Sequence, residues 1–230
     1  MEPLLRASHV SKRYGGRAVL KDVDLVVNKG EAIAIVGENG CGKSTLLRIL
    51  AGVTKPSGGS VTLSPKAKAG FIPDRYEKIN MKAAVFLSHM AAMEGKRPGA
   101  AEGLCRAFFL DGMLDTPMKY LSKGALQKVA AVQALIGERD ILFVDEPLSG
   151  QDAASRANFT DEILKRKQSG TAVVMACHEP YLIEKIADSI LQIKNGALTD
   201  GTQYLFMRAQ PEMRFSARVP RRRFRPYGRS

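Results

Sequence analysis

The chain has 230 residues, of which 45% are hydrophobic and 25% charged, and it carries a formal net charge of +12. Its length and apolar content are sufficient for one large domain with a buried core, so a wholly disordered chain is excluded. Because no apolar run approaches the roughly 20 residues of a membrane-spanning helix, and residues 1–10 lack the apolar segment of a signal peptide, we expect a cytoplasmic protein.

The positive charge is concentrated near the end of the sequence. From Met207 onward, eight arginines accompany a single acidic residue, Glu212. We therefore expect two parts, a domain over residues 1–205 and a basic, arginine-rich tail over residues 206–230. Such tails are commonly solvated. This one also suits contact with anionic lipid head groups, with nucleic acid as the less favoured partner.

The sequence begins with two predicted antiparallel strands. Residues 4–10 and 18–28 alternate apolar and polar side chains. Tyr14, Gly15 and Gly16 stand between them and indicate a turn. Tyr14 has two equally good interpretations at this point: an ordinary turn aromatic, or a ring that stacks on a purine bound at the loop that follows.

A phosphate-binding loop follows the apolar residues 32–36. It matches G-x-x-x-x-G-K-[ST] and consists of Gly37, Glu38, Asn39, Gly40, Cys41, Gly42, Lys43, Ser44 and Thr45. Glycines let backbone N–H groups approach a phosphate closely, and the helix that starts here adds its unpaired amides and its dipole. Lys43 would reach the β- and γ-phosphates, Ser44 would bind Mg²⁺, and Thr45 would bond an α-phosphate oxygen. A chance match in a tight strand-to-helix turn is the alternative.

The middle of the chain changes from strands to helices. Short strands are predicted at residues 60–63 and 70–73. Beyond residue 76 the apolar spacing becomes helical. The candidate helices span residues 81–94, 100–114 and 123–136. We interpret residues 76–136 as an α-helical subdomain inserted into the larger domain.

The last third alternates buried strands with helices. The strands are predicted at residues 141–144, 172–176 and 189–193, and the helices at residues 153–168 and 180–187. Short apolar runs without alternation are typical of parallel strands that are covered on both faces. The order of elements therefore predicts an α/β fold with a mostly parallel central sheet and an N-terminal antiparallel β subdomain.

Three polar side chains stand where buried strands end. Asp145 and Glu146 close the strand at 141–144, and His178 follows the strand at 172–176; ligands gather at such ends in open α/β sheets. Because adjacent strand residues point in opposite directions, Asp145 can serve Mg²⁺ while Glu146 acts as general base on a water in line with the γ-phosphate. His178 would bond the γ-phosphate or hold that water. A capping acid pair and a structural histidine are the alternatives.

The order of these motifs resembles the ATP-binding-cassette (ABC) family of P-loop NTPases over residues 3–205, and specifically a stand-alone ATP-binding subunit of a membrane transporter. The resemblance implies that Tyr14 stacks on adenine and that Glu146 and His178 are the catalytic glutamate and the switch histidine. It identifies residues 37–45 with the Walker A loop and residues 141–145 with Walker B. The D-loop is matched by Ser149, Gly150, Gln151 and Asp152.

Two motifs depart from the family pattern. The signature LSGGQ is represented by Leu121, Ser122, Lys123, Gly124 and Ala125. In the family this segment binds the γ-phosphate of ATP held by the opposite subunit, and its place at a helix N-terminus favours an anion despite the changed side chains. The glutamine that the family has after a short strand is replaced by Asp74. Asp74 can still ligate Mg²⁺ or orient water, but it adds a negative charge near the phosphates.

The resemblance implies an ATPase that uses Mg²⁺. Two such subunits, identical or paralogous, would close head to tail around two Mg-ATP. They would drive transport through a separate transmembrane permease, at the inner face of the cell membrane. We expect export, because the compact helical subdomain and the altered signature are similar to those of small export systems. A soluble ABC ATPase acting on nucleic acid or ribosomes and a regulatory subunit that only binds ATP are the alternatives.

Overall fold

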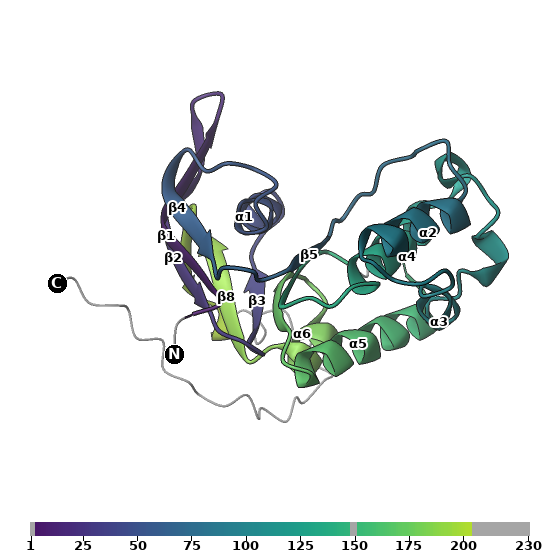
Figure 1. The fold of residues 1–230 in the computed structure, drawn as a ribbon. Coiled ribbons are helices and arrows are strands. Elements are labelled where there is room, and N and C mark those ends of the chain that lie inside the picture. Colours follow the sequence, from purple (N-terminus) through teal and green to yellow (C-terminus); the bar gives the residue numbers. More distant parts are fainter. Residues whose placement is uncertain (1–2, 148–150, 204–230) are drawn as a thin grey trace, which may run out of the picture.

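The computed structural model describes residues 3–147 and 151–203 (Figure 1). The strands are β1 (Leu5–Tyr14), β2 (Arg17–Val27), β3 (Ala32–Val36), β4 (Gly58–Leu63), β5 (Ala69–Ile72), β6 (Ile141–Asp145), β7 (Ala172–Ala176), β8 (Ser189–Lys194) and β9 (Ala197–Asp200). The helices are α1 (Lys43–Leu50), α2 (Ala83–Met93), α3 (Glu102–Ala107), α4 (Lys123–Leu135), α5 (Ala153–Gln168) and α6 (Pro180–Ile186), with 3₁₀ turns η1 (Asp111–Met113) and η2 (Met118–Tyr120). This order of strands and helices is that of an α/β fold.

The larger sheet places the ends of three strands next to one another. Its strand order is β5-β6-β7-β3-β8-β9, and all neighbours are parallel except β9, which runs antiparallel to β8. Because β7 lies between β6 and β3, the segments that follow these three strands emerge side by side. The phosphate loop follows β3, Asp145 ends β6, and His178 comes shortly after β7.

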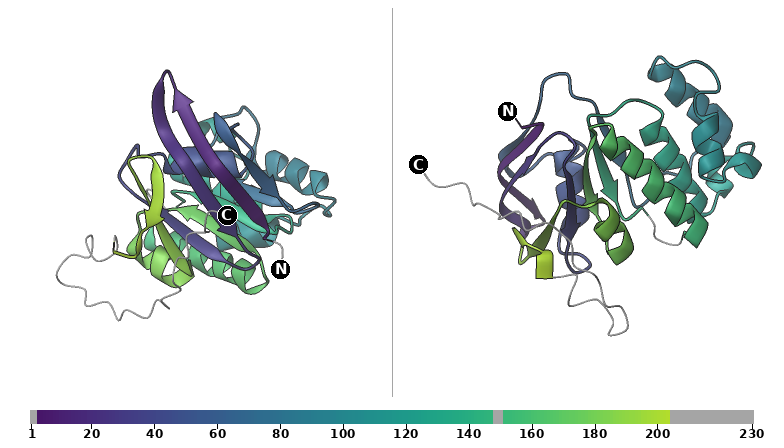
Figure 2. Two further views of the ribbon diagram at one scale, coloured as in Figure 1. Left: turned by 90° about the vertical axis from the view of Figure 1, so that its left-hand side faces the viewer. Right: turned by 90° about the horizontal axis from the view of Figure 1, so that it is seen from below.

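Two hydrophobic cores lie on opposite faces of this sheet. Ala34 and Val36 of β3 belong to one core, and Ile33 and Ile35 belong to the other. The first core is closed by helices α2 to α6. The second is closed by α1 and by the antiparallel sheet β2-β1-β4, a division that is visible in Figures 1 and 2. The parallel strands are thus covered on both faces, which explains their unbroken apolar sequences.

The expected fold class is confirmed, with two local differences. Strand β9 was not predicted from the sequence. The helix predicted at residues 100–114 is wrong in its length, since α3 covers only residues 102–107 of it. Phe109 has a left-handed φ of 55°, and the N–H of Leu110 donates to the carbonyl of Cys105 at 2.9 Å. A left-handed residue with such a bond ends a helix, and apolar periodicity does not reveal it.

Some predicted features lie outside the described residues. These are the basic tail over residues 206–230 and two members of the predicted D-loop, Ser149 and Gly150. Asp152 of the D-loop and the whole signature segment are described. Among the helices of the described ranges, none combines the length and the apolar content that crossing a membrane requires.

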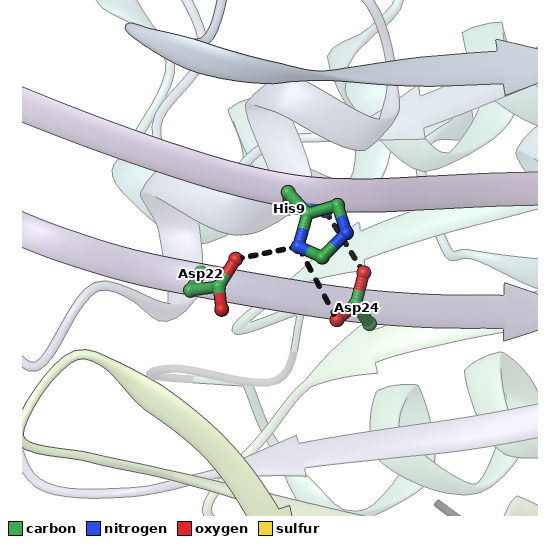
Figure 3. Close-up of side chains that lie close together, drawn as sticks. All are labelled: His9, Asp22 and Asp24. Carbon is green, nitrogen blue, oxygen red and sulfur yellow. Dashed lines mark hydrogen bonds and ion pairs between the residues drawn. The ribbon is translucent and has the colours of Figure 1, made fainter. Parts of the chain in front are cut away.

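A polar cluster occupies an irregularity in the pairing of β1 with β2 (Figure 3). The register shifts between Ala7 and Val10, and there His9 and Asp22 have left-handed φ angles of 53° and 51°. The N–H of His9 donates to Asp24 Oδ1 at 2.8 Å, and His9 Nδ1 lies 2.7 Å from Asp22 Oδ1. The hydrogen bond to Asp22, followed by the charges of Asp24 and Asp22, raises the pKa of His9 above its usual 6.5.

This raised pKa makes a prediction about pH. Protonated His9 stabilises the folded chain below pH 6.5, and the stabilisation is lost as the pH rises through the raised value. Asp22→Asn is expected to move the pKa of His9, measured by NMR titration, toward 6.5, because the bond to Asp22 is the largest cause of the shift. Asp24→Asn should move it less, and His9→Gln assigns the signal. A His9 pKa at or below 6.5 in the unmodified protein would contradict this account.

Candidate active site

The phosphate loop turns tightly between β3 and α1 because of its glycines. Gly37 has a φ of 148° and Gly42 a φ of 116°, values that other residues rarely adopt. A Cβ on Gly37 would lie 2.7 Å from Cys41 Sγ and 2.9 Å from the carbonyl oxygen of Ile193, and a Cβ on Gly42 would lie 3.0 Å from Val19. Helix α1 begins without a side-chain cap. Its first turn therefore has the character of a helix terminus that binds an anion.

The ammonium group of Lys43 lies at the centre of the site. Lys43 is 6% exposed. Its Nζ donates to the carbonyls of Gly37 and Glu38 at 3.0 and 3.2 Å. The same atom lies 2.8 Å from His178 Nε2 and 3.9 Å from Glu146 Oε1. Because a buried cation is costly unless it is paired, these contacts tie the segments after β3, β6 and β7 to one another.

Ser44 and Asp145 form a pair that suits a magnesium ion. The Ser44 hydroxyl donates to Asp145 Oδ1 at 2.8 Å. Asp145 is fully buried, and its other carboxylate oxygen, Oδ2, has no hydrogen-bond partner among the described residues. Burial raises the pKa of Asp145. A buried carboxylate oxygen beside a hydroxyl fits Mg²⁺, which prefers oxygen ligands.

Glu146 is held by its backbone from two sides. It has a left-handed φ of 47°. Its N–H donates to the carbonyl of Ala176 at 2.9 Å, and its own carbonyl accepts from Gln127 Nε2 at 3.0 Å. Burial raises the pKa of the Glu146 carboxyl to about 7, although the charge of Lys43 lowers it. A carboxylate whose pKa is near neutral is well matched to act as a general base.

His178 completes the group at the strand ends. Its Nε2 lies 3.2 Å from Glu146 Oε1 as well as 2.8 Å from Lys43 Nζ. The predicted catalytic residues are thus in mutual contact with the phosphate-loop lysine, as the positions of the strand ends required. The residues that the structure brings together here are Lys43, Ser44, Asp145, Glu146 and His178.

A hollow of about 420 Å³ lies beside the phosphate loop. It is lined by Glu38, Asn39, Gly40 and Cys41 of the loop, by Arg17, Ala18, Val19 and Lys21 of β2, and by Asn195 and Gly196 between β8 and β9. Tyr14 is not among the lining residues. Tyr14 is 50% exposed, and Lys12 Nζ lies 5.0 Å from the centre of its ring. Stacking of Tyr14 on adenine therefore stays a prediction, as does the role of Thr45, which lies half-buried in the first turn of α1.

The signature segment forms the start of helix α4. Ser122 caps the helix, because its side chain accepts a hydrogen bond from the N–H of Ala125 at 3.2 Å. The carbonyl of Gly124 accepts from Gln151 Nε2 at 2.9 Å. Leu121 is buried. The contacts within the chain thus fix the direction in which this helix terminus points.

Asp74 is paired with basic side chains. Its Oδ1 lies 2.8 Å from Lys123 Nζ, and its Oδ2 lies 3.6 Å from Arg75 Nε. Asp74 and Lys123, two of the residues that depart from the family pattern, therefore contact each other. The magnesium-binding role predicted for Asp74 remains a prediction.

Asp152 is a helix cap in this structure. Its Oδ1 accepts from the N–H of Ser155 at 2.8 Å and its Oδ2 from the Ser155 hydroxyl at 2.7 Å. These bonds lower the pKa of Asp152 to about 2. The predicted D-loop therefore joins the start of α5 through Asp152.

Gln127 is a residue of the site that the motifs did not identify. It is 2% exposed, and its Nε2 donates to the carbonyls of Asp74 at 3.2 Å and of Glu146 at 3.0 Å. Gln127 Oε1 has no hydrogen-bond partner in the described part of the chain. The signal that was present in the sequence is a polar residue at a core position of an alanine-rich helix.

The raised pKa of Glu146 predicts the effect of removing its charge. From about pH 4.5 to about 7 the folded chain binds this proton more tightly than the unfolded chain, so the stability falls as the pH rises. Glu146→Gln should therefore increase the free energy of unfolding at pH 8 by about 1 to 2 kcal/mol, after allowance for partial exposure. Denaturant unfolding at pH 5 and pH 8 measures the difference, which should shrink at the lower pH. Glu138→Gln, at an exposed site, is the control, and equal stabilities at pH 8 would contradict the prediction.

Comparisons with known proteins identify the family. A model of the ABC transporter family matches residues 20–149. The zinc import ATP-binding protein ZnuC of Jannaschia sp. (strain CCS1) is 32% identical over 214 residues, which cover 92% of this chain and 87% of that protein. The ZnuC protein of Pseudomonas putida (strain KT2440) is 30% identical over 204 residues, which cover 87% of this chain and 78% of that protein.

Solved structures show the same fold. An ATP-binding subunit of an ABC transporter has a TM-score of 0.76 and 27% identity, covering 85% of this chain and 88% of that one. A dimeric ATP-binding cassette in a post-hydrolysis state, bound to ADP and phosphate, has a TM-score of 0.76 and 22% identity. The match covers 84% of this chain and 96% of that one. At this identity it supports the fold alone. This chain belongs to the ABC transporter family, as an ATP-binding subunit with ATPase activity.

Proposed function

We propose that this chain hydrolyses Mg-ATP in a head-to-tail dimer of ATPase subunits and so drives transport through a separate transmembrane permease. One observation carries the proposal. Lys43 Nζ lies 2.8 Å from His178 and 3.9 Å from Glu146, so the phosphate-binding lysine and the candidate base share one site. If Asp145 and Glu146 were only a structural acid pair, Glu146 would have no need to lie beside the lysine of a phosphate loop.

Each residue of the site has a distinct task in this proposal. Lys43 binds the β- and γ-phosphates, and the N–H groups of the phosphate loop surround them. Glu146 takes the proton of the attacking water, for which its pKa of about 7 is suited. His178 holds the water or the γ-phosphate beside Glu146. Mg²⁺, when held by Ser44 and Asp145, would neutralise charge on the phosphates.

The signature segment, residues 121–125, is proposed to act on the opposite subunit. Ser122 and Gly124 would donate to the γ-phosphate of ATP bound there, and the N-terminus of α4 would add its dipole. Two identical chains or two paralogues satisfy this arrangement equally. Hydrolysis would depend on dimerisation because each site needs groups from both subunits.

The permease is proposed to contact the helical subdomain, residues 76–136, which places the chain at the inner face of the cell membrane. For the direction of transport, the names of the relatives overturn the expectation of export, because they describe zinc import. We therefore propose import. The arginine-rich tail, residues 206–230, would add attraction to anionic lipids beside the permease at about 1 kcal/mol per basic residue near the surface.

Glu146→Gln tests the proposed chemistry. Loss of a general base is expected to lower kcat about 100-fold while the affinity for ATP stays within about threefold. In the unmodified protein kcat should rise with pH with a midpoint of about 7, as Glu146 loses its proton. Steady-state hydrolysis, nucleotide titration and light scattering for the dimer are the measurements. Glu138→Gln should leave hydrolysis unchanged, and a Glu146→Gln protein that hydrolyses normally would refute the role of Glu146.

The tail has its own test. Removal of residues 207–230, which carry eight arginines and one glutamate, is expected to abolish flotation with phosphatidylserine vesicles at low salt. Vesicles of phosphatidylcholine alone are the control, since they lack the anionic charge. Equal flotation of the full chain and the truncated chain would remove lipid from the list of partners.

A further inference from the structure

Two of the residues that depart from the family pattern, Asp74 and Lys123, lie in different segments and meet in the structure. Asp74 follows β5, and Lys123 is the first residue of α4. Their charged atoms are 2.8 Å apart, and the side chains are 29% and 50% exposed. An exposed ion pair of this kind contributes little stability by itself, so its significance depends on what else is attached to the same two segments.

Gln127 is attached to them. It lies four residues after Lys123, so both side chains leave the same face of α4. Its Nε2 donates to the backbone carbonyl of Asp74 at 3.2 Å and to that of Glu146 at 3.0 Å. The ion pair is exposed, whereas Gln127 itself is 2% exposed and its two hydrogen bonds are partly buried. One face of the signature helix thus contacts the segment after β5 and the candidate base after β6.

The two hydrogen bonds of Gln127 are expected to hold the backbone of Glu146 in position. Removal of the amide would leave two partly buried backbone carbonyls without this donor, and a polar group that loses its partner away from water is costly. Glu146 also has a left-handed φ of 47°, a conformation that persists only when its surroundings hold it. A change in the position of α4 would therefore be transmitted to the backbone of the base.

We propose that Lys123 and Gln127 are positioning residues that clamp Asp74 and Glu146 to helix α4. The base in a chain's own nucleotide site then takes its position from that chain's own signature helix. Within this clamp, Lys123 also neutralises the extra negative charge that Asp74 adds on this side of the site, since their charged atoms are 2.8 Å apart. The effect on hydrolysis rests on the proposed role of Glu146.

A double-mutant cycle tests the ion pair. Asp74→Asn and Lys123→Gln are each expected to lower kcat about fivefold, with the KM for ATP within about twofold, and the double variant should also be about fivefold slower instead of 25-fold. The matched control is the pair Lys82 and Asp115, which has the same chemistry at 3.0 Å. Lys82→Gln and Asp115→Asn should leave kcat within about twofold of the unmodified protein. Effects that multiply in the Asp74 and Lys123 cycle would overturn the proposal.

Gln127→Leu tests the buried contact. It is expected to lower kcat about tenfold with an unchanged affinity for ATP, because binding uses the phosphate loop and the base alone is displaced. Gln133→Leu, on the same helix, is the control and should retain its activity. If Gln127→Leu does not fold, the cycle at the exposed ion pair still decides the proposal. A folded Gln127→Leu protein with normal kcat would overturn it.

The failure of this proposal can be told apart from the failure of the proposed function. The Asp74 and Lys123 cycle is repeated by denaturant unfolding without ATP, where a non-additive change in the midpoint reports the pair whether or not Glu146 is the base. Additive midpoints would overturn the clamp. Normal hydrolysis by Glu146→Gln would instead overturn the role of the base and leave a measured coupling in place.

Discussion

The arrangement of the site depends on one buried charge. Lys43 is 6% exposed, and a cation in such a place needs acceptors around it. The fold supplies them from three strand ends: carbonyls of the loop after β3, the carboxylate of Glu146 after β6 and the imidazole of His178 after β7. Glu146 lies in the same partly buried place, and its own burial raises the pKa of its carboxyl more than the charge of Lys43 lowers it. Phosphate binding and base strength therefore have a common physical origin.

The sequence predicted most of this site because its signals are local. Each signal occupies a few consecutive positions: the glycine spacing of the phosphate loop is one, and the polar residues that follow the apolar strands Ile141–Asp145 and Ala172–Ala176 are the others. The order of the strands in the sheet then brings these signals together, because β6, β7 and β3 are neighbours. Gln127 escaped prediction because its partners are carbonyls 53 and 19 residues away, and a backbone acceptor leaves no mark on the sequence. The left-handed Phe109 that ends α3 was hidden for a similar reason.

Asp74 and Lys123, which both depart from the family pattern, have a different meaning together than separately. Asp74 taken alone adds a negative charge beside phosphates, and Lys123 taken alone adds a positive charge to a segment that already favours anions. At 2.8 Å they offset each other. A substitution in a motif is therefore best judged after its spatial partner is known, because the net charge of the pair governs the field at the site.

The backbone of Glu146 shows how the sheet and the signature helix share control of the base. Its N–H is bonded to Ala176 in β7, and its carbonyl is bonded to Gln127 in α4. A left-handed conformation costs a residue with a side chain of order 1 to 3 kcal/mol and is kept only under such constraint. The bond to the sheet is fixed by the parallel ladder, whereas α4 belongs to the helical segment between β5 and β6. Of the two restraints, the one from α4 is therefore the one that a movement of the helical segment can change without breaking the sheet.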